Sequence, residues 1–471
     1  MANGRACCTA LSAVLGDLTF SPTSLSYDSS QSSYWSLQEA EVEPSCVVQP
    51  KSAEDVSVAI KTMTAIEGCH FAIRSGGHSP NAGAANIASG VTVDLSQLGG
   101  TIISDDRSTV SINPGSTWAA VYETLDLVNL TVAGGRSGGV GVGGLTTGGG
   151  ISFLSPRVGF SCDNVLNYEV VLANGSIVDS QDDADLHISL SGGSNNFGIV
   201  TRIDFAAIEQ GLIWGGNVYY SIDTIDSQLQ AFANISNADT YDDYSSLIMS
   251  LAYDGLLDLS LVANAIEYTK AEIYPPVFQP LMAIPAIDST MRLDTVAGIA
   301  EELATLSPGG SRVLFMTITH GNSISMLNAV YQAWSDSIAD ISKVAGIIWT
   351  FSLEPLPPAI YARSSSNSLG LSDRNGTLVV GLLTAQWTDA ADDNVVEATA
   401  KKLHGDIQTA AEGLGEDDPF LYLNYANTAG WQGDPIASYG EASVARLRST
   451  SSKVDPEGVF QKNVPGGFKL T

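Results

Sequence analysis

The stretch from residue 134 to 150 constrains the fold more than any other part of the chain. It reads GGRSGGVGVGGLTTGGG and holds ten glycines in seventeen positions. Glycine weakens helices and strands, so this composition predicts an irregular loop whose backbone approaches another group closely. The many backbone N–H groups of such a loop suit an anion such as a pyrophosphate. A tight turn between packed strands is the simpler alternative.

The same stretch contains the pattern G-x-G-x-x-G at Gly139, Gly141 and Gly144. In nicotinamide-dependent enzymes this pattern opens a helix whose N-terminus holds the pyrophosphate. The residues that follow, Leu-Thr-Thr-Gly-Gly-Gly, argue against such a helix, and the chain has no Gly-Lys-Ser or Gly-Lys-Thr of a P-loop. Neither nucleotide-binding fold is therefore expected.

A second glycine turn, Arg74-Ser-Gly-Gly-His-Ser, follows an expected strand that begins at Phe71. Its His78 would project from a loop whose backbone is free to contact a ligand, which makes this imidazole a candidate for chemistry rather than a structural histidine. The other four histidines have no comparable setting. No His or Cys cluster indicates a metal site, and no Gly-x-Ser-x-Gly indicates a serine hydrolase.

Charge and hydropathy exclude several classes of partner. The 471 residues include 51 acidic and 21 basic side chains, a formal charge of −30, so neither nucleic acid nor an anionic membrane surface is an expected partner. No run of eighteen apolar residues exists, so no membrane span is expected. The length suggests two or three domains.

Five cysteines and four glycosylation sequons bear on the compartment. Either Cys7 or Cys8 could pair with Cys69, or all the cysteines could be ordinary buried thiols. Sequons begin at Asn129, Asn174, Asn234 and Asn375. The N-terminus lacks the apolar core of a signal peptide, so the protein is expected to be either intracellular or a secreted protein whose signal was replaced by an initiator Met.

The pattern of expected elements predicts an α+β protein. A strand from Cys46 leads to a helix capped by Ser52, and Tyr168 to Val178 reads as a hairpin with an Asn-Gly turn. From about 206 to 414, longer helical patterns such as Asn328 to Val344 alternate with strands. This alternation of helices and strands predicts a second domain, an antiparallel sheet with helices on one face.

Five motifs, in order, resemble the FAD-linked oxidases of the berberine bridge enzyme-like group, within the wider vanillyl-alcohol oxidase family. They are RSGGH at 74–78, VGVGGLTTGGG at 140–150, CDNVLNYEVVLANG from Cys162, GGSNNFGIVT from Gly192, and the C-terminal YLNY at 422–425, with Tyr439-Gly and VDPEGVF beyond it. The resemblance runs from about 35 to 205 and from 420 to 470, and it is weaker in between.

The resemblance implies a two-part FAD domain, residues 1–205 completed by 415–471, with a substrate domain at 206–414. It implies a covalent bond from His78 to the flavin and a backbone role for Ile199 near the adenine. Tyr422 and Asn424 would reach the flavin from the C-terminal segment. The implied FAD contacts are Arg74, Ser75, Gly76, Gly77, His78, Ser79, Gly135, Ser137, Val140, Gly141, Gly143, Gly144, Thr147, Gly149, Ile199, Tyr422 and Asn424.

Two departures from the family pattern have consequences. Doubly linked members carry a Cys where this chain has Ser137, so a single link through His78 is expected. Relatives usually read Asp-Leu-Phe-Trp-Ala-Leu where this chain has Asp-Leu-His-Ile-Ser-Leu from Asp185, which puts local packing in doubt. Many fungal members are secreted and begin with a Cys-containing segment like this one, which favours secretion with the signal peptide absent here.

The implied activity is that of an oxidase, which transfers a hydride from a small organic substrate of secondary metabolism to FAD. The reduced FAD is then reoxidised by O2, which becomes hydrogen peroxide. Glu354, at the end of an expected strand among apolar neighbours, is a candidate base, as are Tyr361 and Tyr422. Three alternatives stay open. They are a flavoprotein cyclase that closes a ring oxidatively or by cycloaddition, a carbohydrate oxidase, and a non-catalytic binding protein that retains the fold.

Overall fold

A small mixed sheet forms the N-terminal part of the protein, seen in a computed structural model that describes residues 3–362 and 367–470. Its strand order is β1-β2-β4-β3, with β2 and β3 both parallel to β4. As predicted, Ser52 caps the helix after β2 by accepting a hydrogen bond from the Asp55 N–H. The elements are β1 (Thr19–Phe20), β2 (Cys46–Val48), β3 (Phe71–Arg74), β4 (Val91–Asp94), α1 (Gly4–Leu15), α2 (Leu25–Ser32), α3 (Leu37–Ala40) and α4 (Ala53–Thr64).

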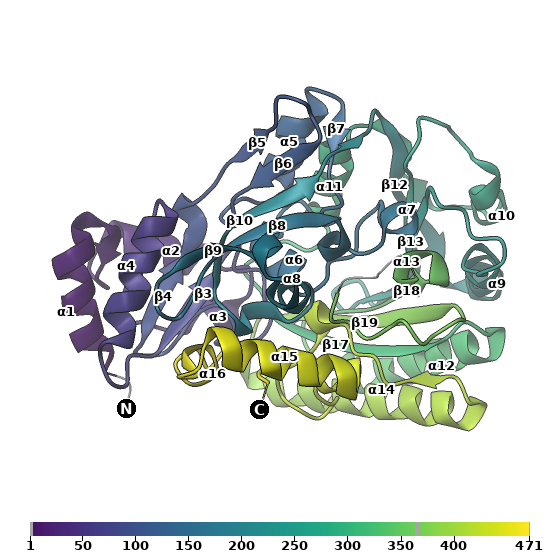
Figure 1. Cartoon of the computed structure of the whole chain (residues 1–471). Coiled ribbons are helices and arrows are strands. Elements are labelled where there is room, and N and C mark those ends of the chain that lie inside the picture. The colour runs from purple at the N-terminus through teal and green to yellow at the C-terminus, as the bar shows by residue number, and fades with distance from the viewer. Residues whose placement is uncertain (1–2, 363–366, 471) are drawn as a thin grey trace.

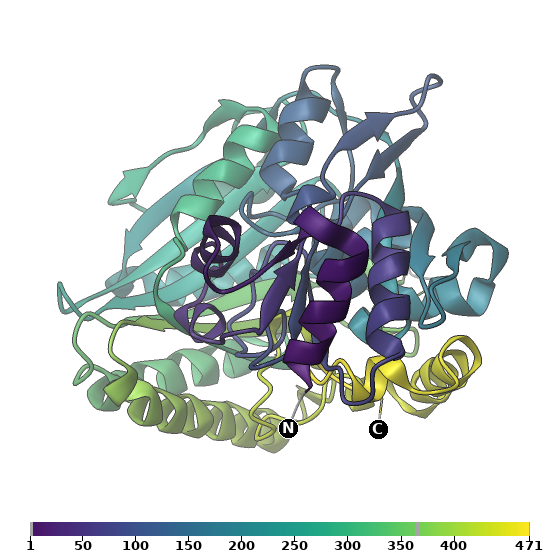
Figure 2. The same ribbon diagram turned by 90° about the vertical axis from the view of Figure 1, so that its left-hand side faces the viewer.

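Two disulfides fasten this N-terminal part. Cys7 is bonded to Cys69, one of the pairings left open above, and Cys8 is bonded to Cys46. The buried-thiol alternative therefore holds for Cys162 alone. The first disulfide joins α1 to the turn that precedes β3, and α1 packs beside α4 on the outer side of the sheet (Figures 1 and 2). Disulfides agree with folding in an oxidising compartment, whereas secretion itself stays a prediction.

A second sheet, fully antiparallel, follows in the order β5-β6-β10-β8-β9. The predicted hairpin is present, because β8 pairs with β9 around the Asn-Gly turn. The elements of this region are β5 (Thr101–Ile103), β6 (Thr109–Ile112), α5 (Trp118–Asp126), β7 (Leu130–Thr131), α6 (Val142–Thr147), α7 (Ser155–Val158), β8 (Val165–Val171), β9 (Ile177–Asp179), α8 (Ala184–Leu190), β10 (Ile199–Ala206) and β11 (Ile208–Glu209).

The prediction of a purely irregular loop at 134–150 is wrong in one part, because α6 lies within it. Tertiary contacts rather than propensity support this short helix. Val142 is fully buried, the Gly143 N–H donates to the Ser75 hydroxyl at 3.1 Å, and the Leu145 carbonyl accepts from the Asn424 amide at 3.0 Å. The helix has only six residues and ends at Gly148, so the remaining glycines keep the loop character that the composition predicts.

A nine-stranded antiparallel sheet dominates the rest of the chain, in the order β15-β12-β14-β13-β18-β19-β17-β20 with β16 also paired to β12. Helices α9, α12 and α14 pack on one face, which confirms the predicted layering (Figure 1). The strands are β12 (Ile213–Ser221), β13 (Ser245–Asp254), β14 (Leu259–Tyr268), β15 (Asp288–Ser289), β16 (Arg292–Asp294), β17 (Arg312–Gly321), β18 (Ile348–Leu356), β19 (Leu378–Trp387) and β20 (Asp417–Asp418). The helices are α9 (Ile225–Ile235), α10 (Gln279–Met282), α11 (Val296–Thr305), α12 (Ile324–Ile341), α13 (Pro358–Tyr361) and α14 (Asp393–Leu414).

The C-terminal segment returns to the N-terminal half. Helix α15 (Glu441–Val454) packs on α8, and Phe460 of α16 (Val459–Lys462) lies edge-on to Phe71 of β3 with ring centroids 6.2 Å apart. The α+β fold class is therefore confirmed, while the exact boundaries at 205 and 414 stay a prediction.

Helix α8 is packed although it lacks the Phe-Trp pair usual in relatives. His187 lies against Tyr168, and its Nδ1 is hydrogen-bonded to the Ser180 hydroxyl. No helix in the described ranges is long and apolar enough to span a membrane.

Candidate active site

A cavity of about 510 Å³ lies between the two glycine-rich segments and the face of the large sheet that is opposite α9, α12 and α14. Its size falls in the range of small-molecule and cofactor sites. Strand alternation explains the sheet's contribution. On β13, Met249 and Leu251 point to the helices, whereas Ile248 and Ser250 line the cavity. The same period places Thr350, Ser352 and Glu354 of β18, and Leu382, Thr384 and Gln386 of β19, on the cavity wall.

The two glycine segments meet backbone to backbone at the cavity floor. A Cβ added to Gly76 would lie 2.6 Å from the Gly141 nitrogen, and one added to Gly141 would lie 2.3 Å from the Gly76 nitrogen. Ser75 bridges them, because its hydroxyl donates to the Pro114 carbonyl and accepts from the Gly143 N–H at 3.1 Å. Such a cradle of backbone amides without side chains fits the diphosphate of FAD.

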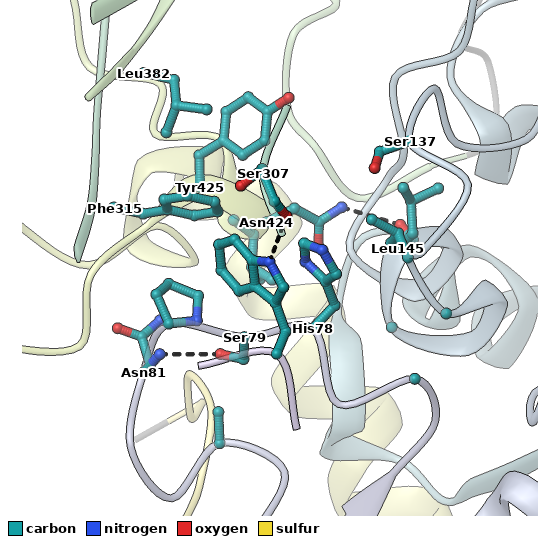
Figure 3. A pocket seen from close by; sticks show the side chains of 18 of the residues that line it. His78, Ser79, Asn81, Ser137, Leu145, Ser307, Phe315, Leu382, Asn424 and Tyr425 are labelled. Carbon is teal, nitrogen blue, oxygen red and sulfur yellow. Dashed lines mark hydrogen bonds between the residues drawn. The ribbon is translucent and has the colours of Figure 1, made fainter. Parts of the chain in front are cut away.

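His78 projects from the first of these segments into the cavity (Figure 3). Burial lowers the pKa of His78 from 6.5 to about 4, so the imidazole is neutral at neutral pH and a ring nitrogen keeps its lone pair. The indole of Trp35 stacks on the imidazole with centroids 4.1 Å apart and planes 13° apart. These features fit a histidine that forms a bond to a cofactor through nitrogen.

Three further lining residues, Arg136, Glu354 and Tyr425, form a closed polar network. The Arg136 guanidinium donates to Glu354 Oε2 at 2.6 Å and to the Tyr425 hydroxyl at 2.9 Å, and that hydroxyl donates to Glu354 Oε1 at 3.0 Å. Burial opposes the charge of Arg136, but the Glu354 carboxylate and Tyr425 raise its pKa. Burial and the Glu354 charge together raise the pKa of Tyr425 well above 10. The arrangement can accept a proton from a bound molecule.

The structure corrects the predicted surroundings of Glu354. Its partners are a guanidinium and a phenol rather than apolar side chains, because the sheet carries Glu354 to the cavity face where the loop from 134 brings Arg136 to meet it. The pair is buried, with exposed side-chain fractions of 9% for Arg136 and 4% for Glu354. Removing one member of a buried ion pair costs about 3–5 kcal/mol, so each residue depends on the other.

Tyr422 and Asn424 lie beside this network and beside α6. The Asn424 amide donates to the Leu145 carbonyl (Figure 3) and also to the Tyr422 hydroxyl, both at 3.0 Å. Burial raises the pKa of Tyr422 above its ordinary value. A Cβ on Gly148 would lie 2.0 Å from Asn424 Oδ1, so the glycine lets the C-terminal segment approach.

Most of the predicted site residues line this one cavity, but several do not. Tyr361 lies in the core and donates its hydroxyl to the Gly376 carbonyl at 2.7 Å, so the structure does not bring it to the site. Arg74 turns away and bonds to Ser30 and Ser33. Ile199 is buried where β10 meets β8, while Gly198 and Val200 line the cavity. Gly135 and Gly149 do not line the cavity, but their Cβ positions lie against Leu145 and Tyr422, which do. Those that line it are Ser75, Gly76, Gly77, His78, Ser79, Ser137, Val140, Gly141, Gly143, Gly144, Thr147, Glu354, Tyr422 and Asn424.

Three residues of the site carry no role in the sequence reasoning. Trp35 precedes the first glycine turn by about forty residues and belongs to no motif. Arg136 stands inside the glycine run, where one cation among glycines is the signal that could have singled it out. Tyr425 ends the motif YLNY, of which only the first and third residues received roles.

Glu267 is a further buried acid near the network. It lies on the cavity-side face of β14, two residues beyond Ala265, and it is fully buried. Burial raises its pKa from 4.5 to about 8, so the side chain is protonated at neutral pH. Elsewhere, the described residues hold no group of three or more side chains placed to bind a metal.

Comparisons with known proteins agree with this geometry. A family model for an FAD binding domain matches residues 44–181. The chain is 38% identical to the FAD-dependent monooxygenase drtC of Aspergillus calidoustus over 99% of this chain and 90% of that protein. It is 42% identical to oligopeptidase PhomG′ of Diaporthe leptostromiformis over 95% of this chain, which spans only 36% of that protein's length. Berberine bridge enzyme in complex with (S)-reticuline shares the fold, with a TM-score of 0.78 at 18% identity over 98% of each chain.

Gly76→Ala should weaken FAD binding, because the new methyl group would separate the two glycine segments at their contact. We expect at least a tenfold rise in Kd, equivalent to about 1.4 kcal/mol. The measurement is flavin absorbance per chain after dialysis, and titration of FAD into the flavin-free protein. Gly139→Ala is the matched control, since nothing lies within 4 Å of its Cβ position in the same loop. Equal FAD content in both variants would contradict the cradle.

Glu267→Gln should stabilise the protein at alkaline pH. Folding raises the pKa of Glu267 from 4.5 to about 8, so below pH 4.5 both states hold the proton and the substitution changes little. Between pH 4.5 and 8 the unfolded wild type releases a proton that the folded protein keeps, so wild-type stability falls relative to the variant, and the gap levels off above pH 8. Melting temperatures from pH 5 to 9 test this, with exposed Glu123→Gln as control. Parallel curves for wild type and Glu267→Gln would refute it.

Proposed function

The chain belongs to the family of FAD-dependent oxidoreductases that includes the berberine bridge enzyme-like proteins, and from that premise we propose that it is an oxidase of a small organic substrate. The observation that carries the proposal is the Arg136–Glu354–Tyr425 network, which opens into the same cavity as the glycine cradle and His78. A redox cofactor site and a proton acceptor thus share one space. A binding protein that merely kept the fold would not need a proton acceptor.

FAD, when bound, would supply the two-electron chemistry, namely acceptance of a hydride from a substrate carbon and transfer of the two electrons to O2, which is reduced to hydrogen peroxide. The chain's own residues would hold it. The loops at Ser75 to Ser79 and Gly141 to Gly144 would receive the diphosphate on backbone N–H groups, and Asn424 would reach the ring from the C-terminal segment. Ser137 stands where doubly linked relatives carry Cys, so the covalent link would run through His78 alone.

Glu354 and Tyr425 would take the proton that leaves the substrate as the hydride departs. The Tyr425 hydroxyl already donates to Glu354, so a substrate hydroxyl or amine near the phenol oxygen can pass its proton to that oxygen while the phenol proton moves to the carboxylate. Arg136 stays charged throughout and holds both oxygens in place. As Glu354 becomes neutral, the guanidinium offsets negative charge that develops on the substrate.

The sheet face facing this network favours a partly apolar substrate with oxygen substituents. Ile248, Ile348, Leu382 and Phe315 offer apolar surface, while Ser250, Thr350, Ser352 and Thr384 offer hydroxyls. This mixture supports an aromatic or polyketide-like molecule of secondary metabolism over a sugar. Cyclisation, with or without net oxidation, uses the same cavity, and oxygen consumption separates the two reactions.

The oxidase proposal predicts a yellow pellet when the purified wild-type protein is precipitated with acid, and a colourless one for His78→Ala, because only a covalent flavin survives denaturation. It also predicts oxygen uptake matched by peroxide formation when candidate alcohols, amines and polyketide-type phenols are screened. Ring closure of a substrate without oxygen uptake would favour the cyclase. The absence of flavin in both pellet and supernatant after incubation with FAD would leave only the binding protein.

Glu354→Gln and Tyr425→Phe should each lower the rate of flavin reduction by about 10²–10⁴, the usual contribution of a general base. The rate is measured anaerobically at 450 nm, with whichever substrate reduces the wild-type flavin. Tyr220→Phe serves as the control, since that buried hydroxyl donates to the Leu281 carbonyl on the helix side of the sheet. If both site variants reduce at the wild-type rate with normal flavin content, the network is not the proton acceptor.

A further inference from the structure

The segment formed by Trp35, Ser36 and Leu37 connects the His78 loop to the large sheet, and we name it the strap. Toward the loop, the Trp35 N–H donates to the Gly77 carbonyl at 3.3 Å and the Ser36 hydroxyl donates to the Ser79 carbonyl at 2.7 Å. These two carbonyls belong to the residues on either side of His78. The strap therefore fixes the backbone from which the imidazole projects.

Toward the sheet, the strap is held by the connection between α11 and β17. The Gly310 N–H donates to the Trp35 carbonyl at 3.0 Å, and the Leu37 N–H donates to the Ser311 carbonyl at 2.9 Å. The indole Nε1 donates to the Ser307 carbonyl at 2.9 Å. The indole is thus fixed at both its backbone and its nitrogen, and it is only 7% exposed.

From the flat stack on this anchored indole, we infer that Trp35 is the positioning residue that holds the imidazole of His78 in the plane required for its covalent bond to FAD. The inference rests on the link proposed above. With centroids 4.1 Å apart and planes 13° apart, the two rings are in face-to-face contact. Rotation of the imidazole about its Cβ–Cγ bond would drive its edge into the indole. The stack on the indole therefore restricts the plane of the imidazole.

The plane matters because the lone pair of a neutral imidazole nitrogen lies in the plane of the ring. A bond to a cofactor carbon forms only when that plane contains the direction to the carbon, and a freely rotating ring spends a small share of its time so aligned. Phe315 backs the indole from the other side, with ring centroids 5.5 Å apart, so the indole cannot withdraw. Trp35 does not touch the reacting atoms in this account, and it acts through His78.

The prediction concerns covalent attachment rather than FAD binding. Trp35→Ala should still bind FAD, because the glycine cradle is intact, but it should form the covalent adduct at least tenfold more slowly. Trp35→Phe keeps an aromatic face and loses only the bond to Ser307, so it should attach FAD within about threefold of the wild-type rate. Trp35→Leu fills volume without a flat face and should behave as Trp35→Ala does.

The experiment incubates each flavin-free protein with FAD and follows the covalent adduct by intact-mass spectrometry, with total bound flavin and melting temperature measured on the same samples. Trp431→Ala is the matched control. Trp431 also contacts a histidine, His404, but edge-on at 75° and 5.7 Å, and it lies outside the cavity lining. This variant should attach FAD at the wild-type rate.

Each outcome separates this inference from the proposed link. Slow attachment in Trp35→Ala and Trp35→Leu with normal bound FAD, and fast attachment in Trp35→Phe, supports the positioning role. Wild-type attachment rates in Trp35→Ala or Trp35→Leu overturn it while leaving the His78 link standing. If Trp35→Ala fails to bind FAD, the attachment rates of Trp35→Leu and Trp35→Phe decide instead: slow attachment in Trp35→Leu with fast attachment in Trp35→Phe supports the positioning role, and equal rates overturn it. A wild-type protein that carries only dissociable FAD refutes the link itself, and the positioning role with it.

Discussion

The close approach of the Gly76 and Gly141 backbones is the constraint on which the site depends. Two segments more than sixty residues apart touch where a single methyl group would not fit, and Ser75 bridges them. Because the segments are fixed there, the residues that flank the contact are fixed as well. His78 and Arg136, which flank the contact, both line the cavity. The glycines are thus a packing requirement, and the amide-rich surface that they expose is the consequence.

The two faces of the large sheet have different roles. One face buries Met249, Leu251 and their neighbours under α9, α12 and α14, which gives the sheet the stability to present polar groups on the other. There, Glu354 forms a direct ion pair with Arg136 at 2.6 Å. A buried ion pair adds little net stability, but its two members must stay in contact, since either charge alone would be unpaired in the interior. The ion pair therefore constrains the position of the sheet relative to the glycine loop.

Local patterns in the sequence predicted the fold well because they report on neighbours along the chain. The Ser52 cap and the hairpin of β8 and β9 both follow from short-range rules. The helix α6 was missed because its support is tertiary. Site residues were predicted where a family motif assigns them a role. They were missed where the role depends on a contact between distant positions of the chain. Arg136 lies 218 residues from Glu354, and no pattern in the sequence selects Tyr425 over Tyr361 as the phenol that reaches the cavity.

The electrostatics of the cavity differ from those of the chain that encloses it. The protein carries a formal charge of −30, yet the cavity holds a neutral His78, a paired Arg136 and Glu354, and a protonated Glu267 just behind its wall. Besides His78, Arg136 is the one basic side chain among the described lining residues, so a diphosphate must be held by backbone amides rather than by lysines. The negative field outside disfavours the approach of anionic molecules. This distribution of charge agrees with the proposed function, whose reactants are a neutral organic molecule and O2.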